Sequence, residues 1–202
     1  MTCIVAIRDK NYSIVASDSG AFTESSRLLT TTLKIGNFGK IIFGTAGSIR
    51  VINILKHYLN DPKLIKKTKT QDAETFIVKR FVPILKQALT EAGASYQNDG
   101  GHTFENEIIL IVDTKIFVIQ NDYSVLEPKE DFFASGSASY AASGALYVLN
   151  NLDPTHQIYT IEQKALMALS AAVGLHNTAA APFFMISTKD PETILSLGAS
   201  SA

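Results

Sequence analysis

The chain has 202 residues, of which 46% are hydrophobic, a level typical of a folded protein and too high for a disordered one. Its 18 basic and 19 acidic side chains give a formal net charge of −1, which argues against nucleic-acid binding and adhesion to anionic membranes. Charged residues reach only 18%, below the usual level of about 25%. Either an assembly buries part of the surface, or a small monomer carries a Ser-, Thr- and Asn-rich surface. We expect one domain spanning residues 1–202.

The N-terminus and the cysteine content indicate a cytoplasmic protein. Cys3 is the only cysteine, so no intrachain disulfide can form. Charges at Arg8, Asp9 and Lys10 interrupt the first apolar run, which excludes a signal peptide there. Two long stretches carry no charge, Phe132–Leu152 and Ala165–Thr188, but polar residues interrupt both of them. We expect buried helices and strands in these stretches, not membrane spans.

The first half of the chain predicts four strands followed by two helices. Short β-branched runs around Asp9-Lys10-Asn11 indicate a hairpin, and a second strand pair surrounds Gly36–Gly39. Gly44–Gly47 is expected to turn the chain into a helix that ends at Asn60-Asp61-Pro62, and Pro83 is expected to bend the next helix. The elements are strands at Cys3–Arg8, Tyr12–Ser17, Leu33–Ile35 and Lys40–Thr45, a helix capped by Ser48, and a helix starting at Thr70 or Asp72.

The second half repeats this order. A polar loop is expected at Gly93–His102, followed by strands, two helices and two final strands. The elements are strands at Glu107–Asp113, Lys115–Gln120, Tyr123–Leu126 and Phe132–Ala134, helices from Gly136 to about Asn150 and over Ile161–Val173, and strands at Pro182–Thr188 and Thr193–Leu197. Blocks of strands separated by blocks of helices predict an α+β fold. Two antiparallel sheets stacked face to face, with a helix pair on each outer face, bury every apolar face in a four-layer αββα sandwich.

Thr2 is the first residue with chemical potential. Because threonine is small, we expect Met1 to be trimmed, which leaves Thr2 with a free α-amino group beside its hydroxyl. An α-amine ordinarily titrates at about 7.7–8.0, so it can serve as the base that a hydroxyl nucleophile requires. Many chains begin with Met-Thr, so this feature alone is weak.

Three further residues strengthen the signal from Thr2. Asp18 ends the second strand of the first hairpin, and strand pairing brings it back near residue 2. Lys34, if buried beside an acid, can lower the pKa of the amine and stabilise an alkoxide. Gly44 can offer a backbone N–H to an oxyanion. Each also has an ordinary interpretation, as a turn residue, a surface lysine and a turn glycine.

Together these motifs resemble proteasome β-type subunits, which are N-terminal nucleophile hydrolases. The matching segments are Met1–Ala6, Val15–Ser19, Lys34 and Phe43–Ser48. Because we expect no propeptide before Thr2, the resemblance is nearest to bacterial HslV and Anbu-like members. Ala134–Ser139 resembles the family's Gly-Ser-Gly-Ser segment, and the element order matches its αββα sandwich.

The resemblance implies a role for each of these residues. Thr2 is the nucleophile, Asp18 and Lys34 tune it, Gly44 supplies the oxyanion N–H, and Ser137 orients the amine. The family's substrate pocket falls on three further positions, of which Arg50 can favour an acidic substrate side chain or simply be a surface residue. The three pocket positions are Ile42, Ala46 and Arg50.

The sequence departs from the family pattern after the helix that begins near Ile161. His176 and Ala179 stand where an acidic residue and a serine are frequent, and Asn177 or Thr178 is a possible substitute hydrogen-bond partner. Ala138 also replaces a glycine. These departures motivate an alternative in which the chain has no catalytic activity.

The leading hypothesis is a threonine peptidase that cleaves peptide bonds through an acyl-enzyme on Thr2. The resemblance implies a homo-oligomeric ring, with two stacked rings as the favoured form, and no metal or other cofactor. HslV implies an ATPase unfoldase partner, whereas Anbu-like members leave that partner open. One alternative is a non-catalytic ring subunit, which retention of Met1 would favour. Another is an amidase that acts on small molecules.

Overall fold

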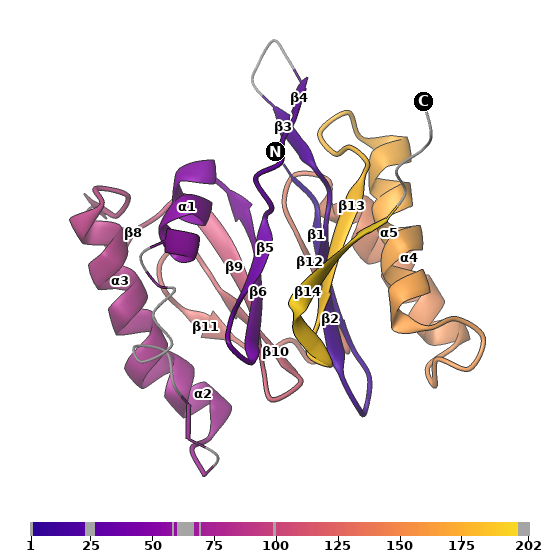
Figure 1. Ribbon diagram of the computed structural model, residues 1–202, viewed down its shortest axis with the longest axis horizontal. Helices are drawn as coiled ribbons and strands as arrows, with labels where there is room; N and C mark the ends of the chain where they lie inside the picture. Colours follow the sequence, from indigo (N-terminus) through magenta and orange to yellow (C-terminus); the bar gives the residue numbers. More distant parts are fainter. Residues whose placement is uncertain are drawn as a thin grey trace.

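Two antiparallel sheets of five strands each lie face to face in the computed structural model (Figure 1). The structure describes residues 2–22, 27–57, 59, 67–68, 70–98 and 100–197. The strand order is β12-β1-β2-β13-β14 in the first sheet and β11-β10-β9-β6-β5 in the second. The strands of the first sheet are β1 (Ile4–Arg8), β2 (Ser13–Ser17), β12 (Phe132–Ser135), β13 (Phe183–Ser187) and β14 (Asp190–Leu197). Those of the second sheet are β5 (Ile35–Phe38), β6 (Ile41–Gly47), β9 (Asn106–Val112), β10 (Lys115–Ile119) and β11 (Val125–Leu126).

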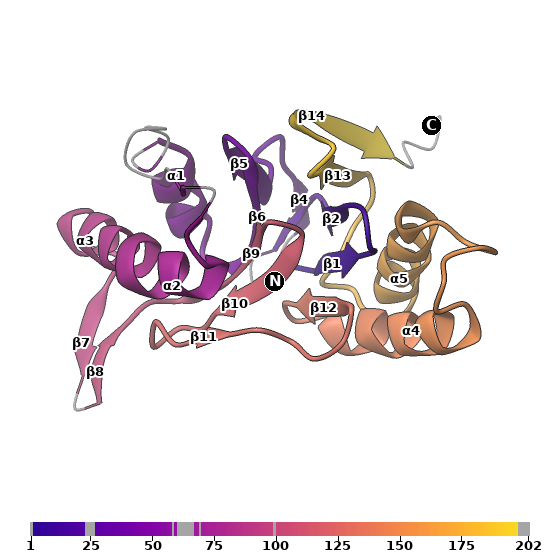
Figure 2. The same ribbon diagram turned by 90° about the horizontal axis from the view of Figure 1, so that it is seen from below.

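Helices cover the outer side of each sheet (Figure 2). The helices α4 (Ser139–Leu152) and α5 (Ile161–Leu175) pack on the first sheet. The second sheet carries α1 (Ile49–His57) and a continuous helical run of α2 (Ala73–Phe76), η1 (Ile77–Phe81) and α3 (Val82–Glu91). This arrangement confirms the predicted α+β class. Within the described part of the chain, no helix is both long and apolar enough to cross a lipid bilayer.

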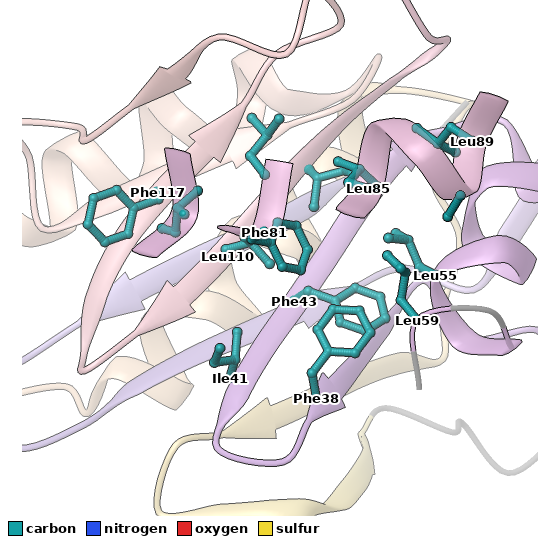
Figure 3. Packing of buried hydrophobic residues seen from close by; sticks show 14 of the residues in the cluster. Phe38, Ile41, Phe43, Leu55, Leu59, Phe81, Leu85, Leu89, Leu110 and Phe117 are labelled. Atoms are coloured by element: carbon teal, nitrogen blue, oxygen red, sulfur yellow. The ribbon is translucent and has the colours of Figure 1, made fainter. Parts of the chain in front are cut away.

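Three apolar layers hold the sheets and helices together. Strand β1 contributes to two of them, because Ile4 and Ala6 face the second sheet while Val5 and Ile7 face α4 and α5. Burial on both faces explains why the strand is apolar from Ile4 to Ile7. The third layer, between the second sheet and α1 and α3, is rich in aromatic rings (Figure 3). There Phe38 stacks on Phe43 with ring centroids 4.6 Å apart.

Helix ends follow the predicted capping chemistry. The Ser48 hydroxyl accepts a hydrogen bond from the Arg50 N–H at 3.3 Å, and the Asp72 carboxylate accepts one from the Thr75 N–H at 2.9 Å. The predicted end of the first helix, Asn60-Asp61-Pro62, lies outside the described residues. The π-helical turn η1 ends at Phe81, two residues before Pro83. A proline lacks an N–H and crowds the preceding turn, and the wider turn accommodates this within one continuous helical run.

Several sequence predictions are wrong in detail. Gly44–Gly47 is not a turn but the end of β6, because its backbone pairs with β9. Gly36–Phe38 belongs to β5, so the turn lies at Gly39 and Lys40. The predicted loop at residues 93–102 includes β7 (Tyr96–Asn98), which pairs with β8 (Gly101–Thr103). A hairpin of β3 (Gly20–Phe22) and β4 (Arg27–Leu29) was not predicted.

Helix α4 also corrects the expectation that the uncharged stretches are buried. Only Ala142 and Leu146 of this helix are buried. Its outer face carries large apolar side chains that are more than half exposed, namely Tyr140, Tyr147, Val148 and Leu152. The low charge of this segment therefore reflects an apolar surface on the isolated chain.

Candidate active site

Thr2 lies two residues before β1, which pairs with β2 on one side and with β12 on the other. Ile4 pairs with Ser17 on β2 and with Ser135 on β12. The residues just beyond these partners, Asp18 and Ser137, therefore flank the start of the chain. Thr2 is only 3% exposed, and its carbonyl accepts a hydrogen bond from the Ala138 N–H at 3.4 Å. The hairpin register thus brings together three of the predicted site residues.

Three backbone N–H groups hold the buried Asp18 carboxylate. The Cys3 N–H donates to Oδ1 at 2.9 Å, and the Gly20 and Ala180 N–H groups donate to Oδ2 at 2.9 and 3.2 Å. These donors come from the start of β1, from β3 and from the segment after α5. The carboxylate therefore joins the N-terminus to two other parts of the fold.

Lys34 completes this arrangement from the second sheet. It precedes β5, and its carbonyl accepts the Thr45 N–H at 3.0 Å, which ties it to β6. Its ammonium lies 2.6 Å from Asp18 Oδ1 and donates to the Gly20 carbonyl at 2.6 Å. Burial lowers the pKa of Lys34, and the Asp18 charge opposes that shift. The structure thus brings Asp18 and Lys34 together as a buried ion pair behind Thr2.

Ser137 lies beside the backbone nitrogen of Thr2. The two atoms are 3.3 Å apart, with Thr2 N donating to Ser137 Oγ. Gly136 makes this approach possible, because its φ is +101° and a Cβ atom there would lie 2.1 Å from the Thr2 carbonyl oxygen. The Gly-Ser segment therefore fits tightly against Thr2.

The segment after α5 supplies partners in spite of its departures from the family pattern. The Ser137 hydroxyl donates to Thr178 Oγ1 at 3.0 Å, so Thr178 takes the place of a hydrogen-bonding serine. His176 ends α5, and its N–H bonds the Ala172 carbonyl. Ala179 is buried in the apolar cluster under α5. The sequence alone leaves Asn177 and Thr178 as two candidates for this partner. The hydrogen bond to Ser137 identifies Thr178.

The structure does not place Gly44 at the site. Gly44 lies in β6 between the sheets, where a Cβ atom would come within 2.6 Å of Val15 and 2.7 Å of Ile4. It permits close packing of the sheets, and it does not line the cavity beside Thr2. Gly47, three residues further on, does line that cavity and has a φ of +129°. The candidate donor of the oxyanion N–H is therefore Gly47, at the junction of β6 and α1, and not Gly44.

Asn106 fixes the backbone on both sides of Gly47. Its Nδ2 donates to Thr45 Oγ1 at 3.0 Å and to the Ser48 carbonyl at 3.2 Å, and its Oδ1 accepts the Ser48 N–H at 2.9 Å. The side chain is buried, so these bonds are shielded from water. A polar residue at the start of an apolar strand was the only signal for it in the sequence.

A cavity of about 520 Å³ opens beside Thr2. Ala46 lines it, as the family pocket implies. Ile42 does not, because it is fully buried between the sheets. Arg50 also points elsewhere: its Nη2 donates to the Ala92 carbonyl at the end of α3. The expectation that Arg50 faces the substrate is therefore wrong for this structure.

Besides Asn106, four polar residues that line the cavity were not predicted from the sequence, namely Glu105, Glu107, Gln120 and Asn121. Glu107 pairs with Ala46 and shares the alternating face of β9 that carries Ile109 and Ile111. Both isoleucines are buried between the sheets, so Glu107 is the polar continuation of that face at its open end. Because β9 is apolar on both faces from Ile108 onward, the sequence does not show which of its faces or ends opens onto the cavity.

Cys3 does not supply a reactive thiol. It is fully buried, and this burial, with a smaller effect of the Asp18 charge, raises the pKa of its thiol to about 12. Among the described residues, no three His, Cys, Asp or Glu side chains are grouped so as to hold a metal ion. Thr2 and the backbone at Gly47 line the cavity, and the buried Asp18–Lys34 pair adjoins Thr2 through the Cys3 N–H.

Comparisons with known proteins identify the fold of the chain. The sequence matches no known family model, and no curated protein matches it. BPH of Thiobacillus denitrificans, in complex with epoxomicin, superposes with a TM-score of 0.73 at 20% identity, over 92% of this chain and 97% of that one. HslV of Trypanosoma brucei gives 0.64 at 18% identity, over 92% and 98%. Anbu, an ancestral beta-subunit from Yersinia bercovieri, gives 0.67 at 13% identity, over 98% and 88%. The chain thus shares the proteasome-like N-terminal nucleophile hydrolase fold of these proteins.

Proposed function

We propose that the chain is a threonine peptidase that uses Thr2 Oγ as its nucleophile once Met1 has been removed. One observation carries the proposal, namely that hydrogen bonds fix the backbone nitrogens of Thr2 and Cys3. Thr2 N lies 3.3 Å from Ser137 Oγ, and Cys3 N donates at 2.9 Å to the Asp18 that pairs with Lys34. While Met1 is attached, Thr2 N is a peptide nitrogen with no basic lone pair. Its removal converts that atom into an α-amine at the same position.

The α-amine acts as the base in the first half of the reaction. It accepts the proton of the Thr2 hydroxyl while Oγ attacks the carbonyl carbon of the scissile bond. The negative charge that develops on the carbonyl oxygen is stabilised by the backbone N–H of Gly47. The α-ammonium then gives its proton to the leaving nitrogen, the C–N bond breaks, and an ester on Thr2 remains.

Water completes the cycle by the reverse use of the same groups. The α-amine takes a proton from water, the hydroxide attacks the ester, and Gly47 again stabilises the oxyanion. The Thr2 hydroxyl leaves with the proton from the amine, and the carboxylic acid product is released. Ser137, held by Thr178, orients the amine in both halves of the reaction.

The Asp18–Lys34 pair supports the nucleophile from behind. The Asp18 carboxylate accepts the Cys3 N–H, which fixes the path of the backbone from Thr2 into β1. The ammonium of Lys34 supplies a buried positive charge, which favours the deprotonated forms of the hydroxyl and the amine nearby. Both residues therefore act through Thr2.

We also propose a cytoplasmic homo-oligomeric ring built from this single domain, 1–202, with two stacked rings as the favoured form. The exposed apolar face of α4, around Tyr147 and Leu152, supports an assembly, because a large apolar surface is usually covered by a partner. The experiment is light scattering coupled to size-exclusion chromatography. A ring requires a mass several times that of the 21.9 kDa chain, and a monomer at micromolar concentration would contradict it. Dependence on an ATPase unfoldase is then tested by adding one to a folded protein substrate.

Peptide hydrolysis by the wild-type chain and by Thr2→Ala tests the catalytic proposal. We expect wild-type protein lacking Met1 to cleave fluorogenic peptides, and Thr2→Ala to lose at least about 10³-fold in kcat/KM. Thr2→Ser keeps a hydroxyl and an amine, so it should retain measurable activity. Equal peptidase activity in wild type and Thr2→Ala would contradict the proposal. A Met1-free oligomer that cleaves no peptide would favour the non-catalytic ring subunit.

A further inference from the structure

The cavity beside Thr2 carries negative charge without a compensating cation. Two of its lining residues are Glu105 and Glu107, and none of the other described lining residues is a lysine, arginine or histidine. Within the described part of the chain, neither carboxylate forms an ion pair. The ammonium of Lys34 does not neutralise them, because it is bound to Asp18 and to the Gly20 carbonyl, neither of which lines the cavity.

Ser135 provides a second and independent sign that this cavity receives a polar group. It lines the cavity and is only 2% exposed, yet its hydroxyl has no hydrogen-bond partner among the residues that the structure describes. An unpaired buried hydroxyl costs about 1–3 kcal/mol, so such groups normally have a partner. Ser135 pairs with Ile4, whose side chain faces the second sheet, so the hydroxyl lies on the same side as Glu107.

These groups form an acceptor-rich subsite. Glu107 is half-buried opposite Ala46, while Glu105 is exposed at the rim. Gln120 and Asn121 also line the cavity, although the Gln120 side-chain carbonyl already accepts the Ser124 hydroxyl at 3.2 Å, so the carboxylates and Ser135 make up the acceptor set. An ammonium group has three donors and no acceptor, and a guanidinium has five donors, so both match such a set of acceptors.

We propose that the Glu107 subsite binds a lysine or arginine side chain of the substrate, next to the scissile bond. This inference rests on the proposed peptidase function and names its substrate class. It replaces the preference for acidic side chains that Arg50 suggested, since Arg50 is bound to Ala92 at the end of α3. A half-buried carboxylate is screened less by salt than a surface one, which makes it an effective discriminator of charge.

The test compares peptides that differ only in lysine, norleucine or glutamate, placed just before or just after the scissile bond. Wild-type protein should prefer lysine over norleucine by about tenfold in kcat/KM at one of the two positions, as expected for a hydrogen bond to a charged group. Glu107→Gln should reduce that ratio to about two, and Glu107→Lys should favour glutamate. Glu130→Gln, an exposed carboxylate without an ion pair in the described structure, is the matched control and should leave the ratio unchanged.

Binding separates this inference from the proposed function. Thr2→Ala cannot form the ester, so the affinity of the same peptides for Thr2→Ala and for Thr2→Ala/Glu107→Gln reports the subsite alone. A lysine preference that disappears with Glu107→Gln supports the subsite, even if wild-type protein hydrolyses nothing. Equal affinity for lysine and norleucine peptides, or a lysine preference that survives both Glu107 variants in folded protein, would overturn it.

Discussion

Replacing Lys34 with methionine should destabilise the fold strongly. Methionine keeps most of the aliphatic volume but removes the ammonium that lies 2.6 Å from Asp18 Oδ1. The Lys34 side chain is 3% exposed and that of Asp18 is 0% exposed, so the carboxylate would be left buried without its counterion. Removing one partner of a buried pair costs about 3–5 kcal/mol. Because three backbone N–H groups still hold Asp18, we expect a loss near the lower end, about 3 kcal/mol.

The measurement is urea-induced unfolding at pH 7, with wild type and variant compared at equal m-values. Lys115→Met is the matched control, because its ammonium also pairs with a carboxylate, Glu127, at 3.1 Å. That pair is 47% and 33% exposed, and exposed pairs contribute about 0–1 kcal/mol. The same substitution at the two lysines therefore separates burial from side-chain chemistry.

The double variant Asp18→Asn/Lys34→Met identifies the cause of the loss. It removes the unpaired charge, so it should recover part of the stability lost in Lys34→Met, and the two substitutions should not be additive. A loss below about 1 kcal/mol for Lys34→Met, no larger than that of Lys115→Met, would refute the buried ion pair.

Three further outcomes follow from the site geometry. Gly136→Ala should abolish peptidase activity in folded protein, because the new Cβ would lie 2.1 Å from the Thr2 carbonyl oxygen; full activity would contradict this contact. The Cys3 thiol should resist alkylation at pH 8 until urea unfolds the chain, and fast labelling of native protein would be inconsistent with burial. The free energy of unfolding should fall as pH rises from 9 toward 12, because the thiol loses its proton at a lower pH in the unfolded chain than in the folded one. Ser137→Ala should lower kcat about 10²-fold and shift its pH profile, whereas Thr178→Ala should do so more weakly; unchanged profiles would remove both from the site.

The part of the site formed by Thr2 and Asp18 could be predicted from the sequence, because both residues belong to one hairpin. A tight turn at Asp9-Lys10-Asn11 fixes the register of β1 and β2, and that register sets Asp18 beside the start of β1. The apolar runs indicated the strands, and burial on both faces explains their lack of alternation. The hairpin of β7 and β8 was missed because its residues are polar and mostly exposed.

The rest of the site could not be predicted in this way, because it depends on contacts between segments that lie far apart in the sequence. Gly44 and Gly47 both look like turn glycines, and only the pairing of β6 with β9 shows that the first packs between the sheets. Thr178 reaches Ser137 through the path of the chain after α5, which no local pattern specifies. Glu107 opens onto the cavity because β9 starts at the same end of the fold as Thr2.

The most direct test of the central claim is the intact mass of the protein, quenched in acid during turnover of a peptide ester. The account predicts a chain that lacks Met1, with a fraction of the molecules carrying the acyl group of the substrate on Thr2. Retention of Met1 in nearly all molecules, with no acyl adduct, would mean that the α-amine never forms. That result would contradict the assignment of Thr2 as nucleophile.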